Sequence, residues 1–154
     1  MADRPGGSER ASGAPGLTRL RGVQLVAGHL VADAANVVGS RPDGWWRDRA
    51  GAATRLAARL VAALDGGGLA TLVSPDGVVH LVLEGAARTA AIPEHPRLRV
   101  HRAEHDGDSA IAALAAELTG PVTVVTADRG LRERVQACGA TTVGPGTLLG
   151  LLHS

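Results

Sequence analysis

The sequence contains no lysine, so all 16 of its basic residues are arginine. A P-loop nucleotide-binding site needs a lysine that contacts the phosphates, and a Schiff-base enzyme needs a lysine amine. A response-regulator receiver domain also characteristically uses a lysine. The absence of this residue therefore argues against all three classes of protein. Cys138 is the only cysteine, which excludes an internal disulfide and a zinc site built from cysteines.

Aromatic residues are almost absent, because the sequence has no phenylalanine, no tyrosine and only Trp45 and Trp46. Alanine, valine and leucine carry most of the 45% apolar content, and an aliphatic core of this kind suits buried parallel strands covered by alanine-rich helices. A chain of 154 residues is long enough to bury the core of one domain. The net charge of +1 is unlike that of a strongly basic protein that coats nucleic acid.

Long hydrophobic runs are also missing. Residues 1–20 are rich in glycine, serine, proline and arginine and lack the apolar stretch of a signal peptide, so we expect a disordered N-terminal tail followed by one domain over 21–154. The apolar run Val23–Val38 is too short and too polar to span a bilayer. We therefore expect a cytoplasmic protein without a membrane segment.

Strand-like and helix-like segments alternate along the domain. The Ser74–Gly77 segment is a turn signal between the apolar run Leu69–Val73 and the second main strand. This alternation predicts an α/β fold, a three-layer sandwich with a mostly parallel five-stranded sheet. The expected main strands are Val23–Ala32, Val78–Leu83, Leu98–Arg102, Val122–Ala127 and Thr141–Val143, and the expected helices are Trp45–Leu64, Asp108–Leu118, Arg129–Cys138 and Thr147–Leu152.

Each of the first four main strands is followed by at least one acidic residue. These residues are Asp33, Glu84, Asp106 with Asp108, and Asp128. Parallel strands deliver such residues to the same edge of a sheet, where ligands bind. Crowded carboxylates repel one another, and a divalent cation that prefers oxygen ligands removes that cost. The pattern predicts a Mg²⁺ or Mn²⁺ site held by Asp33, Glu84, Asp108 and Asp128.

A simpler interpretation exists for most of these acids taken singly. Asp108 and Asp128 stand immediately before expected helices, where aspartate is a favoured N-cap, and Glu84 precedes a glycine as it would in a solvated turn. Asp33 fits this interpretation least, because it ends an apolar strand and Asn36 follows three residues later.

Two motifs resemble those of a known family. The D-x-x-N opening at Asp33–Asn36, with the segment through Arg49, and T-x-D-R-G-L at Thr126–Leu131 resemble the bacterial NYN branch of the PIN-like nuclease superfamily. The resemblance covers roughly residues 22–152. It implies a sheet of order 3-2-1-4-5 and metal-dependent RNA cleavage. It also implies that Asp33, Glu84, Asp108 and Asp128 bind the metal, and that Asn36 and Thr126 orient a water or the scissile phosphate.

Other side chains could contact RNA. Arg41, Arg49 and Arg129 lie beside the acidic motifs, where arginine can bind phosphates bidentately, although surface ion pairs are an alternative role for each. An exposed Trp45 or Trp46 could stack on a base, or could pack into the core.

The histidines show no metal-binding pattern. His80, His101 and His105 lack the helical i, i+4 spacing of a zinc site, and His105 is the histidine nearest the acids in a position to assist proton transfer.

Three functions are compatible with these residues. The first is a metal-dependent endoribonuclease that acts on single-stranded or structured RNA. The second is a catalytically weak PIN-like module that binds RNA or a protein; Ser109 favours it, because many relatives have a second acid there. The third is a phosphohydrolase that acts on small phosphoesters in the same pocket. The sequence leaves the formation of a homodimer open.

Overall fold

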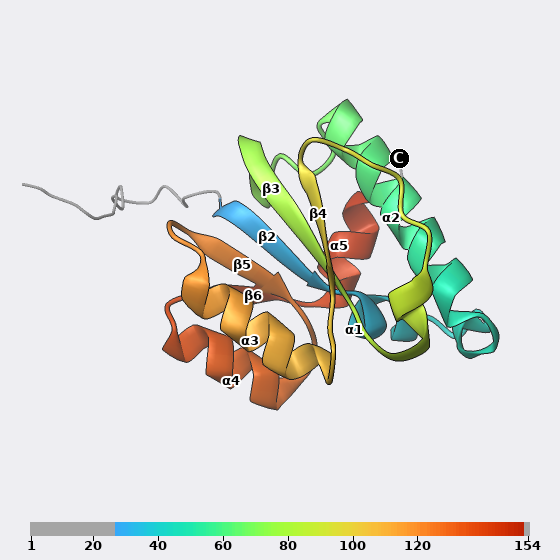
Figure 1. Ribbon diagram of the computed structural model, residues 1–154. Coiled ribbons are helices and arrows are strands. Elements are labelled where there is room, and N and C mark those ends of the chain that lie inside the picture. The colour runs from blue at the N-terminus through green and yellow to red at the C-terminus, as the bar shows by residue number, and fades with distance from the viewer. Residues whose placement is uncertain (1–26, 153–154) are drawn as a thin grey trace, which may run out of the picture.

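The computed structural model describes residues 27–152. Five strands form one sheet in the spatial order β4-β3-β2-β5-β6, and every neighbouring pair is parallel (Figure 1). Counted along the described chain, this is the order 3-2-1-4-5, so the predicted α/β class and strand order are confirmed. The strands are β2 (Ala27–Asp33), β3 (Val73–Leu83), β4 (Leu98–Arg102), β5 (Val122–Val125) and β6 (Thr141–Val143). The predicted tail at residues 1–20 lies outside the described residues.

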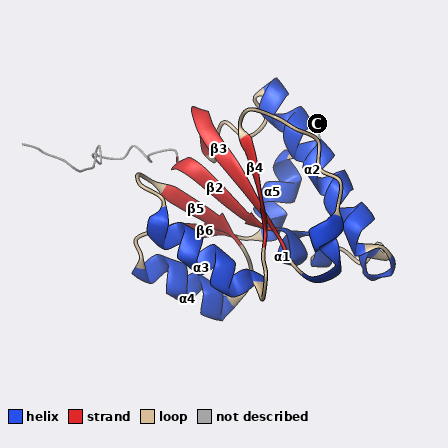
Figure 2. Ribbon diagram, in the orientation of Figure 1, coloured by secondary structure: helices blue, strands red, loops and turns tan. Residues whose placement is uncertain are grey.

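Helices cover both faces of the sheet, which gives the three layers (Figure 2). The larger aliphatic cluster lies on the side of α1 (Ala34–Gly39), α2 (Arg49–Gly66) and α5 (Pro145–Leu151). The smaller cluster lies beneath α3 (Gly107–Glu117) and α4 (Arg129–Ala137). Within residues 27–152 there are also two short 3-10 helices, η2 (Trp45–Arg47) and η3 (Gly85–Thr89). Between residues 27 and 152, no helix has both the length and the apolarity needed to cross a bilayer.

The predicted turn at Ser74–Gly77 is a bulge inside β3. Ala27 of β2 pairs with Val73, but His29 pairs with Val78, so two steps along β2 correspond to five along β3. The three excess residues of β3 have no partner on β2 and form the bulge, which turn-forming residues favour. The run before the bulge is not a strand, because Leu69–Leu72 forms a turn.

Arg97 holds this bulge closed. Its Nε donates to the carbonyl of Gly77 at 2.8 Å, and its Nη2 donates to the carbonyl of Ser74 at 2.7 Å. We expect Arg97→Ala to lower the free energy of unfolding by about 2 kcal/mol, because both hydrogen bonds have a charged donor. Urea unfolding would measure the loss, with the exposed α2 substitution Arg55→Ala as the control. Equal midpoints for the two variants would contradict this role.

Several helix boundaries differ from the predicted ones. Helix α1 follows β2 without a loop, although no helix is predicted there. Helix α2 begins at Arg49 because the Asp48 side chain caps it, accepting a hydrogen bond from the Gly51 N–H at 2.9 Å. The third helix starts at Gly107 and is capped by Asp106, so Asp108 lies inside its first turn. The N-cap role suggested for Asp108 was therefore wrong, because Asp106 holds that position.

Candidate active site

The predicted acids line one pocket at the carboxyl edge of the sheet. The pocket has a volume of about 340 Å³ and lies beyond the ends of β2, β3 and β5. Parallel topology explains this convergence, because each strand ends at the same edge and releases its acid there. The lining residues are Asp33, Ala35, Asn36, Glu84, Asp106, Asp108 and Asp128.

Asp33 lies deepest in this pocket. Its side chain is only 6% exposed, and one of its carboxylate oxygens accepts a hydrogen bond from the Asn36 N–H at 3.3 Å, which caps α1. The other oxygen accepts from the Thr126 hydroxyl at 3.2 Å. These two bonds leave further lone pairs on the carboxylate, so Asp33 is both a cap and a usable ligand.

Thr126 and Asn36 join the β2–α1 junction to the β5–α4 loop. The fully buried Thr126 hydroxyl donates to Asp33 and accepts from the Asp128 N–H at 3.1 Å. The Asn36 side-chain oxygen accepts from the Ala127 N–H at 2.7 Å. Together these contacts fix Asp33 relative to Asp128. The Asn36 side-chain nitrogen remains available on the pocket wall.

Glu84 is held by the start of α3. One of its carboxylate oxygens accepts a hydrogen bond from the backbone N–H of Gly107, the first residue of that helix. A β-carbon at position 107 would lie 2.3 Å from this oxygen, so the contact requires glycine. The sequence prediction did not include Gly107. A glycine between two aspartates at a helix start was the available signal.

The remaining three acids open the helices α3 and α4. Asp128 caps α4 by accepting from the Leu131 N–H at 2.9 Å, so the predicted capping role is confirmed there. Asp106 caps α3 by accepting from the backbone N–H and the hydroxyl of Ser109 at 2.7 and 3.1 Å. The Asp108 side chain makes no hydrogen bond to any residue that the structure describes, which leaves its carboxylate available to a ligand.

The pocket disfavours negative charge at Asp33. Burial raises the pKa of the Asp33 carboxyl from 3.8 to about 6, against the lowering effect of hydrogen bonds from Asn36 and Thr126. The negative charges of Asp108 and Glu84 contribute to the same increase in this pKa.

Asp108 is affected in the same direction. Burial raises the pKa of its carboxyl, and the charges of Asp128, Glu84 and Asp106 add to the increase. Mutual repulsion of this kind is what a bound cation relieves.

The three predicted phosphate-binding arginines do not line the pocket. Arg129 is nearest in the chain, as the exposed first residue of α4 directly after Asp128. Arg49 starts α2, with its guanidinium 5.2 Å from the centre of the Trp45 ring. Arg41 is half-buried in the segment after α1. The structure therefore gathers the acids with Asn36 and Thr126, and leaves the arginines around them.

The acids do not form a closed cage. Within residues 27–152, no three acidic, histidine or cysteine side chains lie close enough together to hold a bare metal ion. The side-chain oxygens instead surround an open volume.

Comparison with known proteins shows the fold. No protein-family model and no curated protein matches this chain. Two crystal structures of Rae1 (YacP) from Bacillus subtilis are similar to it, each with 18% sequence identity over 80% of this chain. One has a TM-score of 0.60 over 72% of its length; the other, a point mutant, has 0.58 over 73%. The chain thus has an α/β fold shared with Rae1.

Proposed function

We propose that the protein is a metal-dependent endoribonuclease of the PIN-like NYN type, which hydrolyses RNA phosphodiesters at the acidic pocket. The observation that supports this most is the convergence of Asp33, Glu84, Asp108 and Asp128, from separate strand ends, on one pocket. The motif resemblance to NYN nucleases and the fold shared with Rae1 are consistent with it.

The residues of the pocket fit a hydrated Mg²⁺ or Mn²⁺ ion. The acidic side chains that line the pocket offer only oxygen ligands, the type that these hard cations prefer. Mg²⁺ keeps several of its waters, so carboxylates around an open volume can hold it through those waters. A bound ion would supply charge neutralisation at the scissile phosphate and activation of a water nucleophile.

The protein's own residues would then position the reactants. Asp33 and Asp128 stay at a fixed separation because Thr126 hydrogen-bonds to both. The Asn36 side-chain nitrogen can donate to a phosphate oxygen or a water in the pocket. Arg129 can pair with an RNA phosphate beside Asp128, with Arg41 and Arg49 contacting RNA farther from the pocket.

A catalytically weak RNA-binding module is the second candidate, and one observation favours it. Ser109 stands where many relatives have an acid, and its hydroxyl is used by Asp106. Asp106 itself lines the pocket, however, so α3 still brings two carboxylates to the site. This arrangement favours the nuclease over the binding module.

The deciding experiment compares cleavage of single-stranded and hairpin RNA by the wild type and by Asp128→Asn with Mg²⁺, with Mn²⁺ and with EDTA. Asparagine keeps the cap of α4, so the variant should fold. We expect a loss of activity on the order of 100-fold, because a charged ligand is removed. Asp48→Asn is the matched control, since Asp48 caps α2 and is not part of the pocket.

Each other outcome has a clear meaning. Equal activity in the wild type and Asp128→Asn would indicate a contaminating nuclease or a wrong site. RNA binding without turnover, insensitive to EDTA, would select the binding module. Phosphate release from mononucleotides with RNA left intact would select a small-molecule phosphohydrolase.

A further inference from the structure

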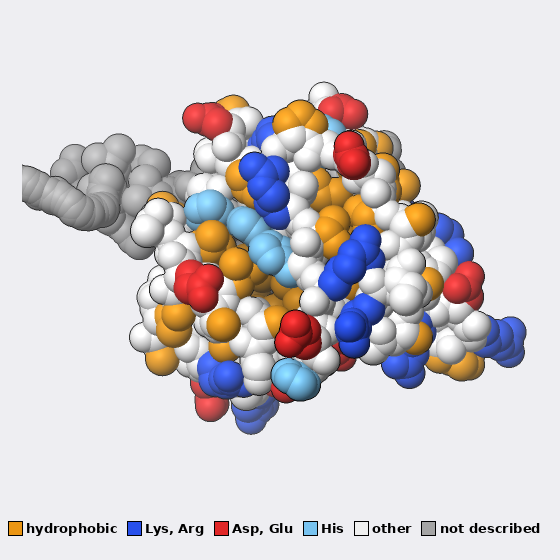
Figure 3. Space-filling view, in the orientation of Figure 1, with side chains coloured by type: hydrophobic (Ala, Val, Ile, Leu, Met, Phe, Trp, Pro, Cys, Tyr) orange, Lys and Arg blue, Asp and Glu red, His pale blue; other side chains and the backbone are white. Residues whose placement is uncertain are grey.

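Three histidines, which look scattered in the sequence, form a hydrogen-bonded row across the sheet. His29 of β2 lies with its Nδ1 3.0 Å from Nε2 of His80 on β3, and Nδ1 of His80 lies 2.9 Å from Nε2 of His101 on β4. Figure 3 shows histidine side chains as a diagonal pale-blue row on the surface. We call these three residues the histidine row.

Strand register places the three histidines on one face of the sheet, where the two outer ones are partly exposed and His80 is buried. His29 is level with Val78, His80 with Arg99, and Val82 with His101, so the histidines and Arg99 share one face of the sheet. Helices α3 and α4 pack on this face, and the cluster beneath them includes residues of β2, β3 and β5 but none of β4. Figure 1 shows these helices in front of β5 and β6, with no helix on this side of β3 and β4. His29 and His101 are half-buried, and Arg99 is exposed.

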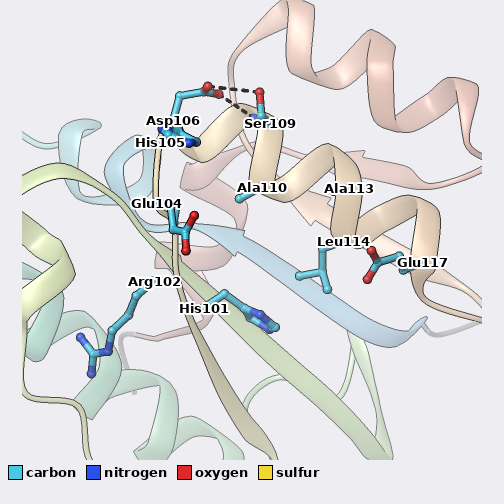
Figure 4. Close-up of a pocket in the computed structure, with 11 residues that line it drawn as sticks. His101, Arg102, Glu104, His105, Asp106, Ser109, Ala110, Ala113, Leu114 and Glu117 are labelled. Atoms are coloured by element: carbon cyan, nitrogen blue, oxygen red, sulfur yellow. Dashed lines mark hydrogen bonds between the residues drawn. The ribbon is translucent and has the colours of Figure 1, made fainter.

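A groove connects this row to the acidic pocket. It has a volume of about 440 Å³ and runs between β4 and α3, from His101 to Asp106. Asp106 also lines the acidic pocket, so the two depressions share a wall. Figure 4 shows His101 pointing toward the side of α3 that carries Leu114 and Glu117. A ligand that enters the acidic pocket can therefore continue toward the histidine row.

The chemistry of the groove suits nucleobases more than phosphates. Burial lowers the pKa of His80 to about 4, with the charges of His101, His29 and Arg99 acting in the same direction, so the ring of His80 is neutral at pH 7. His80 is only 5% exposed and uses both ring nitrogens to hold its neighbours, so the half-buried rings of His29 and His101 are the ones that can stack on bases or bond to them.

The groove itself is lined by acidic side chains, and a basic side chain lies outside it. Glu104, Asp106 and Glu117 line it and would repel a phosphate placed inside. Arg99 stands beside the row on the same face of the sheet, where it can contact a backbone lying outside the groove.

We infer that single-stranded RNA runs from the acidic pocket along the groove between β4 and α3, with its bases against the histidine row and its phosphates near Arg99. This inference rests on the proposed function, and it names the form of the substrate. A duplex would keep its bases stacked inside and could not use the row.

The test is the affinity of fluorescein-labelled single-stranded RNA of 12 nucleotides, measured by anisotropy in EDTA so that no cleavage occurs. We expect His101→Ala and Arg99→Gln each to weaken binding about 10-fold, the size of one lost stacking or phosphate contact. Arg55→Gln, on the exposed side of α2, should bind as the wild type does. A 12-base-pair duplex should bind equally weakly to all four proteins.

A second measurement needs no substitution. In NMR spectra of the wild type, the ring signals of His101 and His29 should shift with the 12-mer and stay in place with the duplex. Unchanged 12-mer affinity in both variants, or unshifted ring signals under saturating 12-mer, would overturn the inference.

The two proposals fail separately. Metal-dependent cleavage together with unaffected 12-mer affinity would reject the groove alone. Binding lost in His101→Ala, from a wild type that cleaves no RNA, would reject the nuclease and retain the groove.

Discussion

Asp33→Asn is expected to stabilise the folded protein at pH 7.5 while lowering RNA cleavage by about 100-fold or more. The pKa of the Asp33 carboxyl is raised from 3.8 to about 6, chiefly by burial. Ionisation of Asp33 at neutral pH therefore lowers the stability of the folded protein. Asparagine removes the charge and keeps an oxygen that can cap α1, while its amide nitrogen cannot accept the bond from the Thr126 hydroxyl, a loss of about 1 kcal/mol that lowers the net gain. We expect the free energy of unfolding to rise by about 1–3 kcal/mol, the upper value being the full pKa difference.

The pH dependence has a definite sign. Between pH 4 and 6 the folded state holds more protons at Asp33 than the unfolded state does, so the wild type loses stability as pH rises through this window. Asp33→Asn has no carboxyl at this position, so its stability does not fall in this way. The gap in melting temperature between the two proteins should therefore be absent near pH 4 and fully open above pH 6.

Thermal unfolding from pH 4 to pH 8, without divalent ions, would measure this gap. Asp48→Asn is the control for the same chemical change at an exposed cap. A variant that melts below the wild type at pH 7.5 would contradict the account of Asp33. Adding Mg²⁺ should raise the melting temperature of the wild type more than that of Asp33→Asn, because the carboxylate then has a counter-charge.

Gly107→Ala is expected to reduce metal-dependent cleavage by about 10- to 100-fold, the range seen when a group that orients a metal ligand is lost. The new β-carbon would lie 2.3 Å from one carboxylate oxygen of Glu84 and 3.1 Å from its Cδ, so this carboxylate has to move. The displaced atoms belong to the flexible end of a side chain. The cost to the fold should therefore be small, offset by the better helix propensity of alanine, roughly 1 kcal/mol.

Steady-state cleavage as a function of Mg²⁺ concentration would show this effect as a higher metal requirement. Gly66→Ala is the matched control, because Gly66 is also helical and an added β-carbon there meets no atom within 4 Å. If Gly107→Ala and Gly66→Ala require the same Mg²⁺ concentration, the Gly107–Glu84 contact has no part in positioning the ligand.

The sequence predicts the parts of the site that follow from strand ends. Asp33, Glu84 and Asp128 each end or follow an apolar run, and parallel topology is sufficient to bring them to one edge. The strand order was predictable only through the motif resemblance, since periodicity alone does not say which strands are neighbours.

Features that depend on tertiary register were not predictable in this way. The Ser74–Gly77 segment has the composition of a turn, and only its pairing with β2 makes it a bulge. Likewise, the three histidines lie on different strands. His80 lies two residues beyond Val78, the partner of His29, and His101 lies two residues beyond Arg99, the partner of His80, and these positions bring the rings together. Helix α1 was missed because its six residues are too few to show a helical period.

Capping by pocket acids also bears on how this protein can change through evolution. Asp33, Asp106 and Asp128 each cap a helix with the carboxylate that faces the pocket, and asparagine caps almost as well. One substitution can thus remove a ligand while leaving a folded descendant, which at position 33 would even be more stable. Selection for folding alone would not retain these aspartates. Their persistence among homologues would therefore report selection for the chemistry of the pocket, and drift to asparagine would mark lineages that keep only binding.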